Sequence, residues 1–175
     1  MNESCYFQFL GTGAGDANFG GPDTTQLSPK DLRRYACNYL TPDLLIDFNN
    51  HTPGALDEYG IDPSSIEYLF ISHGHFDHFQ PLEIIRFAAS LPHPLKVYGS
   101  SMVVDALEFC RENLFDEESG RFVSPKGPYN LETVELAPGS RIAVGEVQVT
   151  AVLSSHSMNK KYNIMEEQAL NFLIE

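Results

Sequence analysis

The chain has 175 residues, enough for one domain with a hydrophobic core and too few for two independent domains. Its 24 acidic residues outnumber the 11 basic ones, giving a formal net charge of −13. This balance argues against binding to the nucleic-acid backbone, which usually requires clustered Lys and Arg. No apolar run approaches the ~20 residues that span a bilayer, and the opening residues lack a signal-peptide pattern. With three scattered cysteines (Cys5, Cys37 and Cys110), which suit reduced thiols, we expect a cytoplasmic protein without a membrane segment.

Hydrophobic periodicity predicts alternating strands and helices over the first two thirds of the chain. The expected strands are 6–10, 36–40, 43–48, 66–72 and 95–98, and the expected helices are 53–60, 81–91 and 101–113. The nearly continuous apolar run at 66–72 is typical of a strand covered on both faces. Ser101 is the candidate N-cap of the last helix.

The segment 115–130 is rich in Gly, Pro and charge, and we expect it to be a loop. After it the hydrophobic period shifts towards two, which predicts strands at 131–136, 141–144, 147–153 and 169–174. Strands with covering helices, followed by a run of strands, indicate an α/β fold built as a layered sandwich.

The strongest chemical signal is the segment from Ser72 to His78, which contains His73, His75, Asp77 and His78. If the backbone stays extended after the preceding strand, His73, His75 and Asp77 point to one side, because alternate residues share a face. His78 would lie just before the helix at Pro81, and a helix N-terminus disfavours a protonated imidazole, so the ring stays able to bind metal. A polar loop that uses its histidines for capping is the alternative interpretation.

This segment resembles the H-x-H-x-D-H signature of the metallo-β-lactamase-fold superfamily of metal-dependent hydrolases. The resemblance implies a four-layer αββα sandwich, with His73, His75 and a later histidine holding one metal ion while Asp77 and His78 begin a second site. His156, which follows the strand predicted at 147–153, matches the later histidine. Three imidazoles with one open position are also what catalytic zinc requires.

Two further segments carry the resemblance. Leu44-Leu45-Ile46-Asp47 is similar to the family's strand that ends in an Asp supporting the metal ligands, although Phe48-Asn49-Asn50 follows where a glycine is common. A simple turn role at the strand end is the alternative for Asp47. The opening FLGTGAG resembles that of the phosphodiesterase-like branch, which includes ribonuclease Z. It is equally consistent with a glycine-rich turn that has no functional role.

In the family, a strand like ALNFLIE leads to a carboxylate that bridges both metals, and a final histidine comes later. The resemblance therefore implies an incomplete domain over residues 1–175, lacking roughly the last third of the sandwich. Because strands near Glu175 would then lack partners, we expect self-association.

The leading hypothesis is a hydrolase with one or two zinc ions, or Mn or Fe, that cleaves phosphodiesters through a metal-activated water, with Asp77 as the catalytic residue of the second metal position. Lactone, ester or thioester hydrolysis is one alternative, and a truncated, non-catalytic metal-binding relative is another. The expected partner is a small anionic or ester substrate and not nucleic acid. Of the remaining histidines, we expect His93 in a loop and His51 near the surface.

Overall fold

The structure is a computed structural model that describes residues 6–14, 34–116, 118–123, 130–156 and 169–175. The strands are β1 (Phe7–Gly11), β2 (Cys37–Leu40), β3 (Leu44–Ile46), β4 (Tyr68–Phe70), β5 (Leu95–Gly99), β6 (Leu114–Asp116), β7 (Arg121–Val123), β8 (Leu131–Glu135), β9 (Arg141–Val144), β10 (Val147–Leu153) and β11 (Leu170–Ile174). The helices are α1 (Thr52–Glu58), α2 (Pro81–Ser90) and α3 (Ser101–Glu112), with a 3₁₀ turn at Pro63–Ser65.

The central sheet has six strands in the order β1-β2-β3-β4-β5-β8. Strands β1, β2 and β3 pair antiparallel, whereas β3, β4, β5 and β8 run parallel to one another. The carboxyl ends of parallel strands meet at one edge of a sheet, and the loops that leave this edge usually carry function. Asp47 lies just beyond the end of β3 and Ser72 just beyond the end of β4, so both lie at this edge.

Alternate residues of the central strands feed two separate cores, as expected for a sheet buried on both faces. Leu45 on β3, Leu69 on β4 and Val97 on β5 belong to the core shared with the helices. The neighbouring residues Phe70 and Tyr98 face the opposite way, and their rings stack with centroids 4.6 Å apart in the second core. The predicted burial of β4 on both faces is therefore confirmed.

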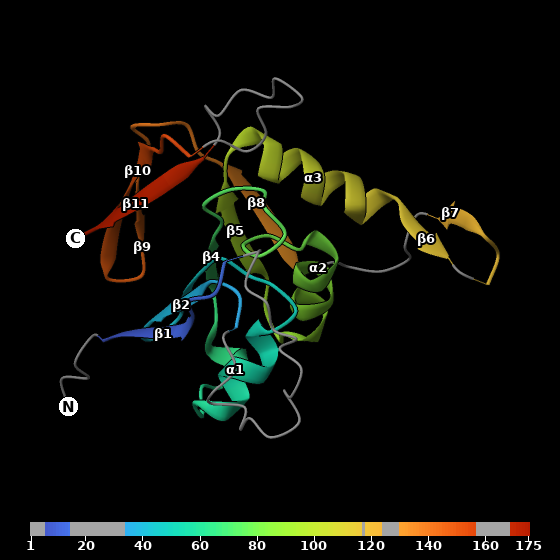
Figure 1. Cartoon of the computed structure of the whole chain (residues 1–175), viewed down its shortest axis with the longest axis horizontal. Helices are drawn as coiled ribbons and strands as arrows, with labels where there is room; N and C mark the ends of the chain where they lie inside the picture. Colours follow the sequence, from blue (N-terminus) through green and yellow to red (C-terminus); the bar gives the residue numbers. More distant parts are fainter. Residues whose placement is uncertain (1–5, 15–33, 117, 124–129, 157–168) are drawn as a thin grey trace.

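A second sheet, with the antiparallel order β11-β10-β9, covers the face of the central sheet that the helices leave open (Figure 1). Phe172 of this sheet packs edge-on against Phe70, with ring centroids 5.2 Å apart. The two sheets are also joined through the backbone, because Leu170 N donates a hydrogen bond of 2.8 Å to Ser72 O. The start of β11 is thus held at the carboxyl end of β4.

All three helices contribute their buried side chains to the first core alone. The described residues therefore form three layers, in the order helices, six-stranded sheet, three-stranded sheet (Figure 1). This arrangement confirms the predicted α/β sandwich. No described helix is long and apolar enough to cross a membrane. Both described cysteines are free thiols: Cys37 is buried, and Cys110 is partly buried.

Most predicted elements match the observed ones within one or two residues, but two predictions were wrong. The N-cap of α3 is Ser100 and not the predicted Ser101, which is the first residue of the helix. The loop predicted at 115–130 begins with the hairpin β6–β7, which extends away from the helix layer (Figure 1). Phe115 and Phe122 face each other across this hairpin with ring centroids 5.4 Å apart. A cross-strand aromatic pair stabilises a hairpin despite the polar composition around it.

Gly99 joins the end of β5 to α3 and leaves no space for a side chain. A Cβ at this position would lie 2.6 Å from Cγ1 of Val103, which is fully buried. We expect Gly99→Ala to lower the free energy of unfolding by about 1–3 kcal/mol, measured by urea denaturation. The control is Gly54→Ala in α1, where an added Cβ meets nothing within 4 Å and alanine favours the helix. An equal loss of stability in both variants would contradict this account of the β5–α3 turn.

Candidate metal centre

The loop after β4 begins extended and then closes into a tight turn. Ile71 N continues the sheet pattern by donating to Tyr98 O at 2.8 Å. The amides of His78 and Phe79 then both donate to His75 O, at 2.9 and 2.8 Å. The prediction that extended backbone runs through Asp77 was therefore wrong. The turn, and not strand alternation, positions Asp77 and His78.

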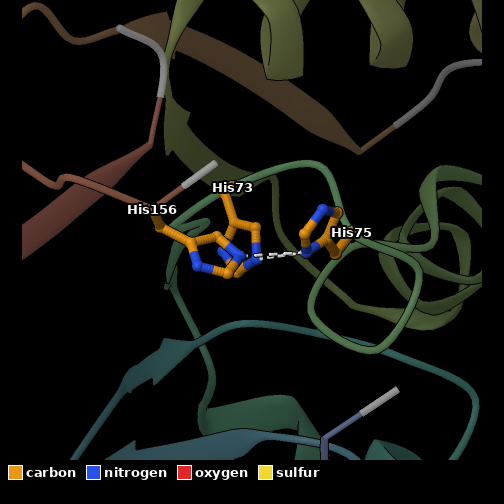
Figure 2. Close-up of side chains that lie close together, drawn as sticks. All are labelled: His73, His75 and His156. Carbon is orange, nitrogen blue, oxygen red and sulfur yellow. Dashed lines mark hydrogen bonds between the residues drawn. The ribbon is translucent and has the colours of Figure 1, made fainter. Parts of the chain in front are cut away.

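The three histidines predicted for the first metal site lie together (Figure 2). His73 Nε2 lies 3.1 Å from His75 Nδ1, and His156 Nε2 lies 3.1 Å from the same nitrogen. The three ligand atoms all fall within 4.8 Å of one another. His73 is buried, His75 is partly buried and His156 is exposed, so the cluster opens to solvent on one side.

His156 reaches this cluster through the second sheet, although it is 81 residues away from His75 in the chain. It follows β10, whose end is fixed by a hydrogen bond of 2.9 Å from Ser154 N to Ala169 O. The next residue, Leu170, donates its amide to Ser72 O beside His73. The contact between the sheets therefore determines that His156 and His73 meet.

A chain of hydrogen bonds determines which nitrogen of His73 faces the cluster. The Asp47 carboxylate accepts the Ser72 hydroxyl at 3.0 Å and the Ser72 amide at 2.8 Å. Because the single hydroxyl proton goes to Asp47, Ser72 Oγ accepts from His73 Nδ1, 2.9 Å away. His73 Nε2 is then left unprotonated and available to a metal ion.

The triad fits a divalent cation better than it fits direct hydrogen bonds. His75 Nδ1 lies 3.1 Å from two other ring nitrogens but has only one in-plane site, so it can complete a hydrogen bond with only one of them. Three unprotonated nitrogens around one ion remove this conflict. In a tetrahedral zinc site such nitrogens lie about 3.3 Å apart, close to the 3.1 Å of the two pairs that include His75 Nδ1. The triad can therefore hold a divalent metal ion.

The surroundings of His73 keep its ring neutral. Burial, together with the charges of His78, His156 and His75, lowers the pKa of His73 to about 3. A neutral imidazole is the form that binds metal, so near neutral pH no proton competes with a cation at this residue.

Asp77 and His78 lie beside the triad and offer two further atoms that could bind a metal ion. His78 Nε2 lies 3.4 Å from Asp77 Oδ2, and its ring centroid is 4.2 Å from that of His73. Burial acts to lower the pKa of His78, but the hydrogen bond from its Nδ1 to Asp47 (2.6 Å) and the charges of Asp47 and Asp77 outweigh burial and raise it. We expected the N-terminus of α2 to keep this ring neutral, but the two carboxylates have the larger effect. Ligation of metal by Asp77 and His78 stays a prediction.

Asp47 is linked to two of the predicted ligands. It hydrogen-bonds to His78 directly and to His73 through Ser72. Its φ is 63°, so the left-handed residue in this turn is Asp47 itself and not one of the asparagines that follow. Asp47 therefore has both of the roles considered for it: it forms the turn after β3, and it accepts hydrogen bonds that orient predicted ligands.

Two residues that hold the predicted ligands in place, Ser72 and Asn49, were not predicted from the sequence. Asn49 is fully buried, and its side-chain amide donates to Ala36 O and to Asp77 O, both at 3.0 Å. Its only sequence signal was a position soon after Asp47 where a glycine was expected. Ser72 had a clearer signal, because a hydroxyl directly before His73 can reach the ring nitrogen of that histidine.

The remaining predicted features lie around the site. His93 is a partly buried loop residue whose Nε2 lies 2.8 Å from Ser64 O. His51 is partly buried, and its Nδ1 accepts the Tyr35 amide at 3.2 Å. Of the glycine-rich turn, the described part packs against Tyr35, where a Cβ on Gly11 would lie 1.9 Å from Tyr35 O. Only glycine allows this approach.

A family model described as a beta-lactamase superfamily domain matches residues 41–175, well over half of the chain. This chain belongs to that family. The matched region contains all five predicted metal ligands and Asp47. A comparison with curated proteins gave no match.

Solved structures show the same metallo-β-lactamase fold. A metallo-β-lactamase fold protein, YhfI from Bacillus subtilis, aligns over 97% of this chain with a TM-score of 0.61 and 13% identity. A diphosphatase from the PhnP family aligns over 96% with a TM-score of 0.64 and 16% identity. A metallo-β-lactamase from Cronobacter sakazakii aligns over 82% with a TM-score of 0.53 and 18% identity. The chain spans 58%, 61% and 50% of these three proteins.

The hydrogen bonds that link Asp47, Ser72 and His73 lead to a testable prediction for this metallo-β-lactamase-fold site. We expect Ser72→Ala to weaken zinc binding about tenfold, because His73 loses the acceptor that orients its ring. Ser72→Thr keeps a hydroxyl and is expected to bind zinc like the unchanged chain. Affinity is measured by competition with a chromophoric chelator. Equal affinities in all three proteins would show that Ser72 does not position His73.

Proposed function

We propose that the protein is a metal-dependent hydrolase that cleaves phosphodiester bonds of small substrates, with zinc held by His73, His75 and His156. The observation that carries the proposal is the mutual approach of three imidazole nitrogens, two of them 3.1 Å from the third. Three nitrogens with an open fourth position are the usual ligand set of catalytic zinc. Membership in the beta-lactamase superfamily domain family supports a hydrolytic use of such a site.

The metal would supply a water molecule whose pKa is lowered from 15.7 to about 7 and would polarise the ester oxygen under attack. The residues of this chain supply the geometry for that chemistry. Asp47 and Ser72 keep the Nε2 atom of His73 unprotonated, and burial of His73 excludes bulk water from one side. The exposed His156 leaves the opposite side open for a substrate.

Asp77 and His78 are the proposed beginning of a second metal position, with Asp77 as its catalytic carboxylate. Asp77 is 5% exposed, and its side chain lies 3.4 Å from His78 Nε2. A buried carboxylate next to a site for a cation is stabilised only if positive charge compensates it. A second ion, or a protonated His78, provides that compensation.

The preference for phosphodiesters is supported by one structural neighbour and by the charge of the chain. The PhnP-family diphosphatase, which by its name acts on phosphate groups, aligns over 96% of this chain. A net charge of −13 disfavours long polyanions such as RNA, because their many phosphates would be repelled. A small phosphodiester brings few charges, and a bound divalent metal offsets them locally.

His156→Ala tests this proposal, with His93→Ala as its matched control. We expect His156→Ala to lower zinc binding at least tenfold and to abolish metal-dependent cleavage of bis(p-nitrophenyl) phosphate, because one of three ligands is lost. His93 lies outside the triad, in the loop that precedes β5, so its variant is expected to keep both properties. Metal content is measured by elemental analysis and cleavage by absorbance, with zinc, manganese or iron added.

A lactone and a thioester are assayed alongside the phosphodiester. Activity on these carboxylic esters alone would overturn the phosphodiester preference while leaving a hydrolase. Zinc binding without turnover of any substrate would favour a non-catalytic relative. Unchanged zinc content in the His156→Ala variant would contradict the site itself.

A further inference from the structure

Phe76 is an exposed aromatic residue directly between two of the predicted metal ligands. Its ring is 55% exposed, whereas the flanking residue Asp77 is buried and His75 is partly buried. Burying a phenylalanine ring is worth about 1.5–3 kcal/mol, so a ring left in water forgoes that stabilisation. Single exposed apolar residues are common on protein surfaces. Phe76 differs from such residues in two ways: it lies between two predicted metal ligands, and hydrogen bonds fix the turn that carries it.

The turn that carries Phe76 is held at several points. The amides of His78 and Phe79 both donate to His75 O, and Gln80 Nε2 donates to Phe76 O at 2.8 Å. The side chain of Gln80 is itself held by the backbone amide of Asn50, which donates to Gln80 Oε1 at 3.1 Å. None of these bonds uses the ring of Phe76. The ring is therefore presented on a fixed turn, and its removal leaves the turn intact.

Two further rings lie behind Phe76. Tyr35 contacts it edge to face, with centroids 5.4 Å apart and planes at 85°. Tyr35 also lies over the His51 ring, with centroids 4.7 Å apart and planes at 30°. Asn49 ties this segment to the turn by donating both to Ala36 O and to Asp77 O. Phe76, Tyr35 and His51 thus form a continuous row of rings, here called the aromatic row, that starts at the metal-binding turn.

We propose that the aromatic row holds a planar, apolar part of the substrate, such as a nucleobase or an aryl group, beside the metal-binding histidines; this rests on the proposed function. The exposed ring supplies a surface for stacking, which suits any planar group and needs no specific hydrogen bonds. Consecutive Cα atoms are about 3.8 Å apart, so the backbone of Phe76 lies directly next to that of His75, a residue of the triad. The substrate class is therefore a phosphate ester of a nucleoside or an aryl alcohol.

The test compares two ligands that carry the same phosphate group, adenosine monophosphate and ribose 5-phosphate. Binding to the zinc-loaded full chain is measured by isothermal titration calorimetry, which requires no turnover. We expect adenosine monophosphate to bind about fivefold more tightly, because only it has a base that can stack. In Phe76→Ala the two affinities are expected to become equal through loss of adenosine monophosphate binding, with ribose 5-phosphate unchanged.

Two variants control for ring chemistry and for general loss of an exposed aromatic residue. Phe76→Tyr keeps a ring and is expected to keep the fivefold preference. Phe122→Ala removes a 66% exposed ring from the β6–β7 hairpin and is expected to change neither affinity. Circular dichroism of each variant checks that the fold is retained.

Equal affinities for both ligands in the unchanged chain would overturn the aromatic row as a substrate site and leave the proposed function standing. A preference that survives in Phe76→Ala would overturn it as well. If zinc binds but neither phosphate does, the aromatic row fails as a substrate site, while cleavage of bis(p-nitrophenyl) phosphate separately decides the proposed function.

Discussion

The two sheets of this protein are joined at Ser72, the residue that precedes the first histidine of the candidate metal site. Leu170 N donates to Ser72 O, and Ser154 N donates to Ala169 O at the end of β10. These bonds bring His156 to a residue 81 positions earlier, an encounter that costs about 4 kcal/mol in loop-closure entropy for an unfolded chain. The sheets and their shared core, with Phe70 between Tyr98 and Phe172, stabilise the encounter before any metal binds. The approach of the three histidines is thus a consequence of packing between sheets.

The polar groups around the triad are buried together and satisfy one another. Asp47 is 4% exposed, and its carboxylate receives hydrogen bonds from Ser72 and from His78. A buried carboxylate with these partners stabilises the structure, whereas the same group without them would destabilise it. The network also determines which nitrogen of His73 faces the cluster. The stability of the fold and the geometry of the candidate metal site therefore depend on the same few hydrogen bonds.

Sequence patterns predicted the elements with strong periodicity and the identity of the clustered histidines. Strands β9 and β10 match their predicted bounds, because alternate burial against the central sheet gives a period of two. Two kinds of hydrogen bond were not predictable. The turn at His75 depends on two nearby amides converging on one carbonyl, a local geometry that the pattern of residue types does not specify. The role of Ser72 depends on Asp47, 25 residues earlier. The β6–β7 hairpin was missed because the Phe115–Phe122 contact exists only after the chain folds back.

The central claim is that three imidazole nitrogens from two separate segments bind one divalent ion. X-ray absorption at the zinc edge measures this directly on the full chain loaded with one equivalent of zinc. The account predicts nitrogen or oxygen neighbours at about 2.0–2.1 Å, with outer-shell scattering that requires three imidazole rings. A spectrum that fits one ring or none, or that contains sulfur at about 2.3 Å, would contradict it.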